Sequence, residues 1–181
     1  MSLRITAALA TLTLSAPAFA DFEAGAHAGY TMMSMSDGGE PFSGPAFGAR
    51  AGFGVGLGLT PEINVTHYSG TNSDDDESSN LSQLQTGLGA RFYIGNFFLR
   101  PFASGHLTYA TAAKLSFSKG EQETAATDVP GSGGMGVDFG GGLQFKFLDL
   151  IYGELQGTYA RTMTDAALSN IYVGAGLGIK I

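Results

Sequence analysis

Apolar and polar residues alternate one by one along most of the chain, and the last segment shows the pattern most regularly. One face of that segment is apolar, comprising Ile171, Val173, Ala175, Leu177, Ile179 and Ile181, and the other carries Asn170, Tyr172, Gly174, Gly176, Gly178 and Lys180. A period of two is typical of a β-strand with one apolar face. Seven earlier segments follow the same rule. The pattern therefore predicts eight strands, at about residues 22–33, 47–58, 62–68, 83–94, 98–110, 135–147, 150–160 and 170–181.

The predicted strands and their connectors have the dimensions of a membrane barrel. Most strands reach the roughly 9–11 residues that a tilted strand needs to cross a bilayer. The strand at 62–68 is short, and we expect its upper end to continue into the following loop. Long polar connectors at 34–46, 69–82, 111–134 and 162–169 alternate with short ones near 59–61, 95–97 and 148–149. This alternation predicts an all-β, eight-stranded antiparallel up-and-down barrel with long loops outside and both termini in the periplasm.

Alternation alone does not say which face points outward, because a soluble lipocalin-like barrel has the same period with its apolar face inside. Here the polar face is mostly glycine, which suits a narrow lumen better than a solvated exterior. Aromatic residues also gather near both ends of the apolar face, as they do at the two interfaces of a membrane. They are Tyr30, Phe47, Tyr109 and Tyr159 at one end and Phe22, Phe92, Phe145 and Phe147 at the other. These features predict that the apolar face contacts lipid.

The first twenty residues differ from the rest and predict a cleavable signal peptide. Arg4 supplies a positive charge, residues 5–14 are apolar, and Ala18-Phe19-Ala20 forms an A-x-A cleavage site. We expect residues 1–20 to be removed and residues 21–181 to form the outer-membrane barrel. No later segment reaches the roughly 18 uninterrupted apolar residues of a transmembrane helix.

Composition excludes several kinds of chemistry. The chain has no cysteine, so it has no disulfide, thiolate metal site or cysteine nucleophile. Its net charge of −7 argues against a nucleic-acid partner. Nothing in the sequence calls for a cofactor or a metal ion.

The eight segments, the alternating loops and the closing Gly174-Ala175-Gly176-Leu177-Gly178 strand resemble the small OmpA-type and OmpX-type outer-membrane barrels. Members of that family usually end in an aromatic residue, whereas this chain ends in Ile181. The resemblance implies a monomer in the bacterial outer membrane, with membrane lipids, lipopolysaccharide and the outer-membrane assembly machinery as partners. It implies a role in envelope integrity, adhesion or surface interaction, and it does not identify the surface ligand.

Ionisable residues on the predicted lumen face are the main candidate site. The expected charge network comprises Glu23, Arg50, Glu62, Arg91, Arg100, Asp138, Lys146, Glu154 and Lys180. We place Arg50 and Asp138 farther from the periplasm than the other members, which lie in the periplasmic half of the lumen, and His27 and His106 between the two levels. Opposite charges are nearly balanced, as a low-dielectric interior requires. The network is interpreted as a plug that fills the lumen; the alternative is a gated path for ions or small solutes.

His67 and Ser69 raise an enzyme hypothesis, because both face outward near the outer rim. An H-x-S pair is similar to the catalytic pair of outer-membrane lipid A deacylases, in which histidine activates serine. The asparagine expected after the serine is replaced by Gly70, and only Glu77 lies near the expected position of the acid. We therefore expect a non-enzymatic protein.

The acidic run Asp74-Asp75-Asp76-Glu77 lacks the spacing of a calcium loop and is interpreted as a solvated loop tip.

Overall fold

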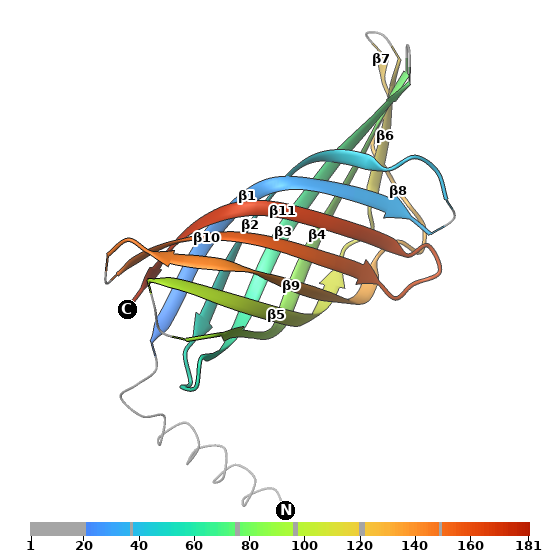
Figure 1. Cartoon of the computed structure of the whole chain (residues 1–181). Helices are drawn as coiled ribbons and strands as arrows, with labels where there is room; N and C mark the ends of the chain where they lie inside the picture. Colours follow the sequence, from blue (N-terminus) through green and yellow to red (C-terminus); the bar gives the residue numbers. More distant parts are fainter. Residues whose placement is uncertain (1–20, 37, 75–76, 96–97, 120–121, 149) are drawn as a thin grey trace, which may run out of the picture.

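The protein forms a closed antiparallel β-barrel (Figure 1). The computed structural model describes residues 21–36, 38–74, 77–95, 98–119, 122–148 and 150–181. The predicted signal peptide at 1–20 lies outside the described residues, so its removal stays a prediction. In the described part of the chain, no helix is long and apolar enough to cross a membrane.

Eight strands make up the barrel wall, as the alternation predicts. They are β1 (Phe22–Met35), β2 (Phe42–Phe53), β3 (Leu59–Asp74), β4 (Glu77–Tyr93), β5 (Leu99–Ala110), β9 (Gly134–Lys146), β10 (Ile151–Thr162) and β11 (Leu168–Lys180). Each pairs with its neighbour in the chain, and β1 pairs with β11 to close the barrel. At the closure, Phe22 and Ile181 exchange two backbone hydrogen bonds of 2.8 Å, which brings the two ends of the barrel domain together. We call this the terminal end, and the opposite end the hairpin end.

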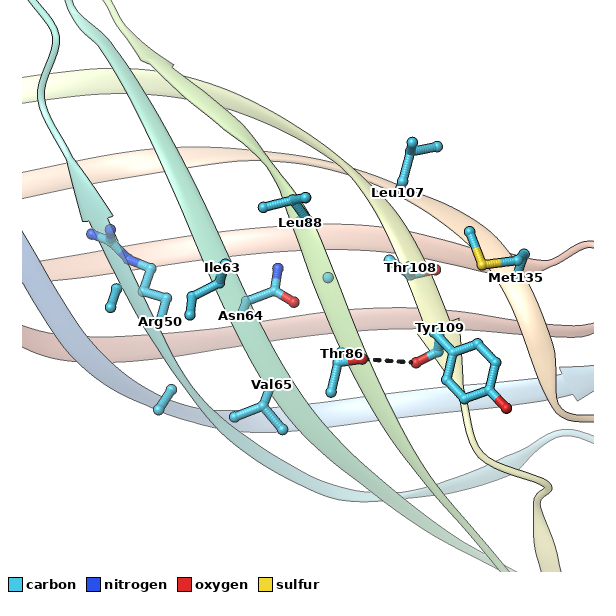
Figure 2. Close-up of a pocket in the computed structure, with 13 residues that line it drawn as sticks. Arg50, Ile63, Asn64, Val65, Thr86, Leu88, Leu107, Thr108, Tyr109 and Met135 are labelled. Atoms are coloured by element: carbon cyan, nitrogen blue, oxygen red, sulfur yellow. Dashed lines mark hydrogen bonds between the residues drawn. The ribbon is translucent and has the colours of Figure 1, made fainter. Parts of the chain in front are cut away.

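The exterior of the barrel wall is apolar, which confirms the predicted orientation of the two faces. Every barrel strand exposes at least one large apolar side chain that is between 52% and 67% exposed: Tyr30, Phe47, Ile63, Leu88, Leu107, Phe139, Leu155 and Val173. Figure 2 shows three of them, Ile63, Leu88 and Leu107, on the neighbouring strands β3, β4 and β5. A continuous apolar belt of this kind is far larger than the isolated patches of soluble proteins. The wall is therefore built to face hydrocarbon.

The segments at 69–82 and 111–134 contain further strands, so their prediction as loops was wrong, whereas the expected continuation of the strand at 62–68 is confirmed by β3. β3 and β4 continue past the barrel as one long hairpin, and β6 (Lys114–Lys119) pairs with β4. Two short strands, β7 (Gln122–Glu123) and β8 (Thr127–Asp128), pair with β6. Together they form a sheet that projects from the hairpin end (Figure 1), called here the projecting sheet. In the projecting parts of β3 and β4, serine, threonine and asparagine lie on both faces, so apolar alternation is largely absent there, whereas β6 retains it at Leu115 and Phe117.

The first turn at the terminal end also lies elsewhere than predicted. The sequence placed a connector at 59–61, but β2 ends at Phe53 and the turn occupies residues 54–58. Leu57 has a φ of 53° in this turn, between Gly56 at 92° and Gly58 at 79°. Apolar residues in the turn keep the period of two, which extends the strand pattern beyond the true strand end.

Candidate functional site

Charged side chains fill the lumen in the half nearer the terminal end, and glycines on the same face leave room for them. A Cβ added to Gly48 would lie 2.6 Å from Nε2 of His27, and one added to Gly89 would lie 2.6 Å from Cδ2 of His106. Both distances are shorter than van der Waals contact. Backbone carbonyl oxygens of Val65 and Gly105 would lie nearer still, so glycine is required here both by the lumen side chains and by the close approach of the backbone.

Two arginines and two glutamates form the centre of the site. Arg50 lies 3.1 Å from Glu62 and 3.0 Å from Glu154, measured from guanidinium nitrogen to carboxylate oxygen. Arg91 bridges the same two carboxylates, at 3.3 Å from Glu62 and 2.8 Å from Glu154. All four residues are at most 4% exposed. Each charge thus has two partners of opposite sign, which is the arrangement that a buried ionic group needs.

Tyrosines and Glu23 extend this centre toward the terminal end. Arg50 lies 3.6 Å from Glu23 and donates a 2.9 Å hydrogen bond to the Tyr152 hydroxyl. Tyr93 donates to Glu23 at 2.9 Å, and Lys180 lies 3.6 Å from the other oxygen of Glu23. The two tyrosines were missed as site residues, although they share the face of Arg91 and Glu154.

His106 joins the central group to Asp138. Its Nε2 lies 2.9 Å from Glu62 and its Nδ1 lies 2.6 Å from Asp138. An ionised carboxylate only accepts hydrogen bonds, so both contacts are satisfied together when both ring nitrogens carry a proton. In that form the imidazole adds one positive charge to the network, opposite the two carboxylates.

The structure does not bring every expected member into ionic contact. Arg100 donates a 3.2 Å hydrogen bond to the Gln144 amide, and its guanidinium lies 4.2 Å from the Tyr93 ring centre. Among the described residues, neither Arg100 nor Lys146 pairs with a carboxylate. The backbone of Arg50 lies two residues farther from the terminal end than that of Glu62, and its side chain reaches Glu62 and Glu154 directly. The lumen charges therefore do not form one evenly connected network, because some of them have several ionic partners and Arg100 and Lys146 have none among the described residues.

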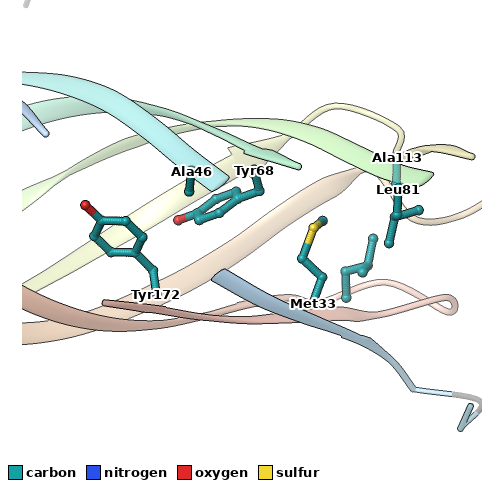
Figure 3. Close-up of a cluster of buried hydrophobic side chains, with 7 residues drawn as sticks. Met33, Ala46, Tyr68, Leu81, Ala113 and Tyr172 are labelled. Atoms are coloured by element: carbon teal, nitrogen blue, oxygen red, sulfur yellow. The ribbon is translucent and has the colours of Figure 1, made fainter. Parts of the chain in front are cut away.

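A small cavity and an apolar cluster lie between the network and the hairpin end. The cavity has a volume of about 30 Å³, and its walls include His27, Tyr68 and Tyr172. Beyond it, seven buried side chains form an apolar plug (Figure 3): Met33, Ala46, Tyr68, Leu81, Ala113, Leu168 and Tyr172. The sequence prediction had not included this plug.

The candidate catalytic pair is not assembled. His67 faces outward, as expected, and its ring stacks on Phe47 with 5.0 Å between the ring centres. Its Nδ1 is buried without a hydrogen-bond partner, and no hydrogen bond connects its side chain with Ser69.

Of the acidic run, Asp74 and Glu77 lie opposite each other on β3 and β4 at the far end of the hairpin, and Asp75 and Asp76 lie outside the described residues. In the part of the chain that the structure covers, no group of three histidine, aspartate or glutamate side chains is arranged to hold a metal ion.

Comparison with known proteins identifies the fold. No family model matches the chain, and no curated protein is similar to it in sequence. The structure of Neisserial surface protein A (NspA) is similar over 88% of this chain and 97% of that chain, with 15% identity and a TM-score of 0.69. OprG from Pseudomonas aeruginosa is similar over 90% of this chain and 96% of its own, with 11% identity and a TM-score of 0.57.

A third similar structure contains a bound ligand. It is Ail, the attachment invasion locus protein of Yersinia pestis, in complex with the heparin analogue sucrose octasulfate. The similarity covers 87% of this chain and 98% of Ail, with 14% identity and a TM-score of 0.54. The chain thus has the fold of the small eight-stranded outer-membrane β-barrels. A shared fold does not fix a function, so the function is argued from the site.

Proposed function

We propose that the protein is a non-enzymatic integral protein of the bacterial outer membrane, in which a closed barrel anchors a sheet at the cell surface. Both termini then lie in the periplasm, and the projecting sheet extends into the medium. The apolar belt, the even number of strands and the polar composition of the sheet support this arrangement. We further propose that the network of Glu23, Arg50, Glu62, Arg91, Asp138, Glu154 and Lys180 keeps the barrel closed.

The filling of the lumen is the observation that carries the proposal. Ionic groups occupy the half near the terminal end, and the cavity above them holds about 30 Å³. The apolar plug then covers the remaining path, and Met33 and Leu81 in it are 0% exposed. A conducting pore needs a continuous water-filled path, and the side chains of this lumen occupy it.

The projecting sheet supports a role in surface interaction. β3 and β4 remain paired as far as Asp74 and Glu77, so this segment is an extended hairpin rather than an irregular loop. Polar side chains also bond across it, as in the 2.7 Å hydrogen bond from Thr71 to Asn80. Ail, which shares this fold, is an attachment protein that was solved with a heparin analogue, so the fold is compatible with binding at a cell surface.

Conductance in planar lipid bilayers tests the closed lumen directly. We expect the purified barrel without residues 1–20 to insert and show no steady single-channel current. Insertion must be established separately, by protease protection of the barrel in the same lipid. Steady currents from inserted wild-type protein would contradict the proposal and favour the narrow-pore alternative.

The non-enzymatic assignment is tested by lipid A analysis. We expect cells that overproduce the protein to have the same pattern of lipid A acyl chains as cells without it, because His67 and Ser69 are not hydrogen-bonded. The His67→Ala variant should give this pattern too. Loss of an acyl chain with the wild-type protein and its retention with His67→Ala would instead establish a lipid A hydrolase.

A further inference from the structure

An open groove runs over the outer face of β2, β3, β4 and β5. Its volume is about 720 Å³. Ala49 and Ala51 lie opposite Val65 and Ile63 on the neighbouring strand, and their small side chains leave space beside these larger ones. Leu88 and Leu107 continue the wall on β4 and β5 (Figure 2).

Nearly all the surface of this groove is apolar. The side-chain hydroxyl of Thr86 donates a 3.3 Å hydrogen bond to the backbone carbonyl of Tyr109, which is drawn as a dashed line in Figure 2. That hydroxyl therefore has a partner within the protein and does not require one from a ligand. The groove suits a hydrocarbon chain.

A second recess, into which several polar side chains face, lies at the hairpin end of the same wall. This notch has a volume of about 390 Å³ and is lined by His67, Ser82, Leu84, Thr111, Lys114 and Asp128. It forms because the chain turns inward between β5 and β6. Ala113 is buried there, and its amide donates a 2.8 Å hydrogen bond to the Ser132 hydroxyl. The inward turn leaves the outer surface beside β4 uncovered.

The notch and the groove are adjacent on three strands. His67 follows Val65 on the outer face of β3, and Thr111 follows Tyr109 at the end of β5. On β4, which runs in the opposite direction, Leu84 precedes Thr86 by the same two residues. Val65 pairs with Thr86, and His67 pairs with Leu84, so both rows are in register. From His67 to Ile63 the wall extends roughly 13 Å, at about 3.3 Å per residue.

We propose that this wall binds one phosphorylated glycolipid, with the head group in the notch and one acyl chain along the groove. Lys114 would contact a phosphate group, since lysine provides a point charge with three donors. Asp128 lies opposite Lys114 in the backbone register of β6 and β8, and both side chains are exposed. Its carboxylate would accept hydrogen bonds from the hydroxyl or amide groups of a sugar head, which a fatty acid lacks. The proposal rests on the outer-membrane location proposed above and is independent of whether the lumen conducts.

The site is tested by titrating purified barrel in detergent micelles with bisphosphorylated lipid A and counting bound lipids by native mass spectrometry. We expect one lipid to be retained per barrel. Lys114→Gln should weaken binding about tenfold or more, because a hydrogen bond to a charged group is lost. Ala51→Phe should weaken binding similarly by filling the groove.

Matched controls separate this site from general lipid adhesion. Arg161 is another exposed cation near the hairpin end, on β10, and Ala103 is another outward alanine, on β5 but outside the groove. Arg161→Gln and Ala103→Phe should bind within about twofold of wild type, since neither alters the site. Equal binding by wild type and Lys114→Gln would overturn the proposal. Equal binding of lipid A without phosphates, or of phosphatidylglycerol, would also overturn the assignment of a phosphorylated glycolipid.

Discussion

Replacing Arg50 by alanine is expected to destabilise the barrel by roughly 3–5 kcal/mol, the usual loss when one partner of a buried ionic group is removed. Arg50 contacts Glu23, Glu62 and Glu154 and is 4% exposed, so its removal leaves these buried carboxylates with fewer partners. The measurement is urea unfolding of the barrel in lipid bilayers. A loss of about 1 kcal/mol or less would show that water solvates the carboxylates, as in a hydrated channel.

Arg100→Ala is the matched control for this prediction. Arg100 is also a buried lumen arginine, at 6% exposed, but it bonds to the neutral amide of Gln144. Its removal leaves no buried charge without a partner, so the loss should be smaller than for Arg50→Ala, about 1.5–3 kcal/mol, the value of a hydrogen bond to a charged group. Equal losses for the two variants would show that arginine packing, and not ion pairing, stabilises the lumen.

A second substitution can isolate the ionic contribution. Glu154→Gln should destabilise the wild-type barrel, because Arg50 and Arg91 lose a charged partner. In the Arg50→Ala background the same change removes a buried charge that has lost one of its two arginines. It should then cost less, and this coupling is measured by a double-mutant cycle. Purely additive effects would contradict the closed ionic group.

The barrel could be predicted from sequence because a single physical signal determines it. Residues that face lipid must be apolar, so the alternation along each strand shows which side chains point outward. Val173 and Leu177 point outward, whereas Gly174 and Gly176 lie on the inner face. The signal fails outside the membrane. The residues of β3 beyond Tyr68 are mainly serine, threonine and asparagine, which water accepts on both faces of a strand. The projecting sheet was therefore not predictable from periodicity.

The alternation also predicts which charged side chains face the lumen, but it does not predict which of them form ion pairs. His106 and Asp138 are opposite residues on neighbouring strands, whereas Arg50 on β2 and Glu154 on β10 meet across the lumen. The second kind of contact depends on strand tilt and on the stagger between strands, which the alternation does not encode. For the same reason Arg100 faces inward as predicted and still lies beside Tyr93 and Gln144.

The outer face of the barrel gives the second large expected effect. Val173→Arg should destabilise the barrel by roughly 2 kcal/mol, below most of the range of about 2–4 kcal/mol for an arginine at the middle of a bilayer, because Val173 pairs with Tyr30 near one end of the apolar face. Val55→Arg is the control, because Val55 is 61% exposed and Val173 is 64% exposed, but Val55 lies in the turn at the terminal end. There the cost should fall to about 1 kcal/mol or less. In water the two positions would be equivalent, so the difference in unfolding free energy measures the lipid environment. Equal losses at the two positions would contradict a membrane-facing wall.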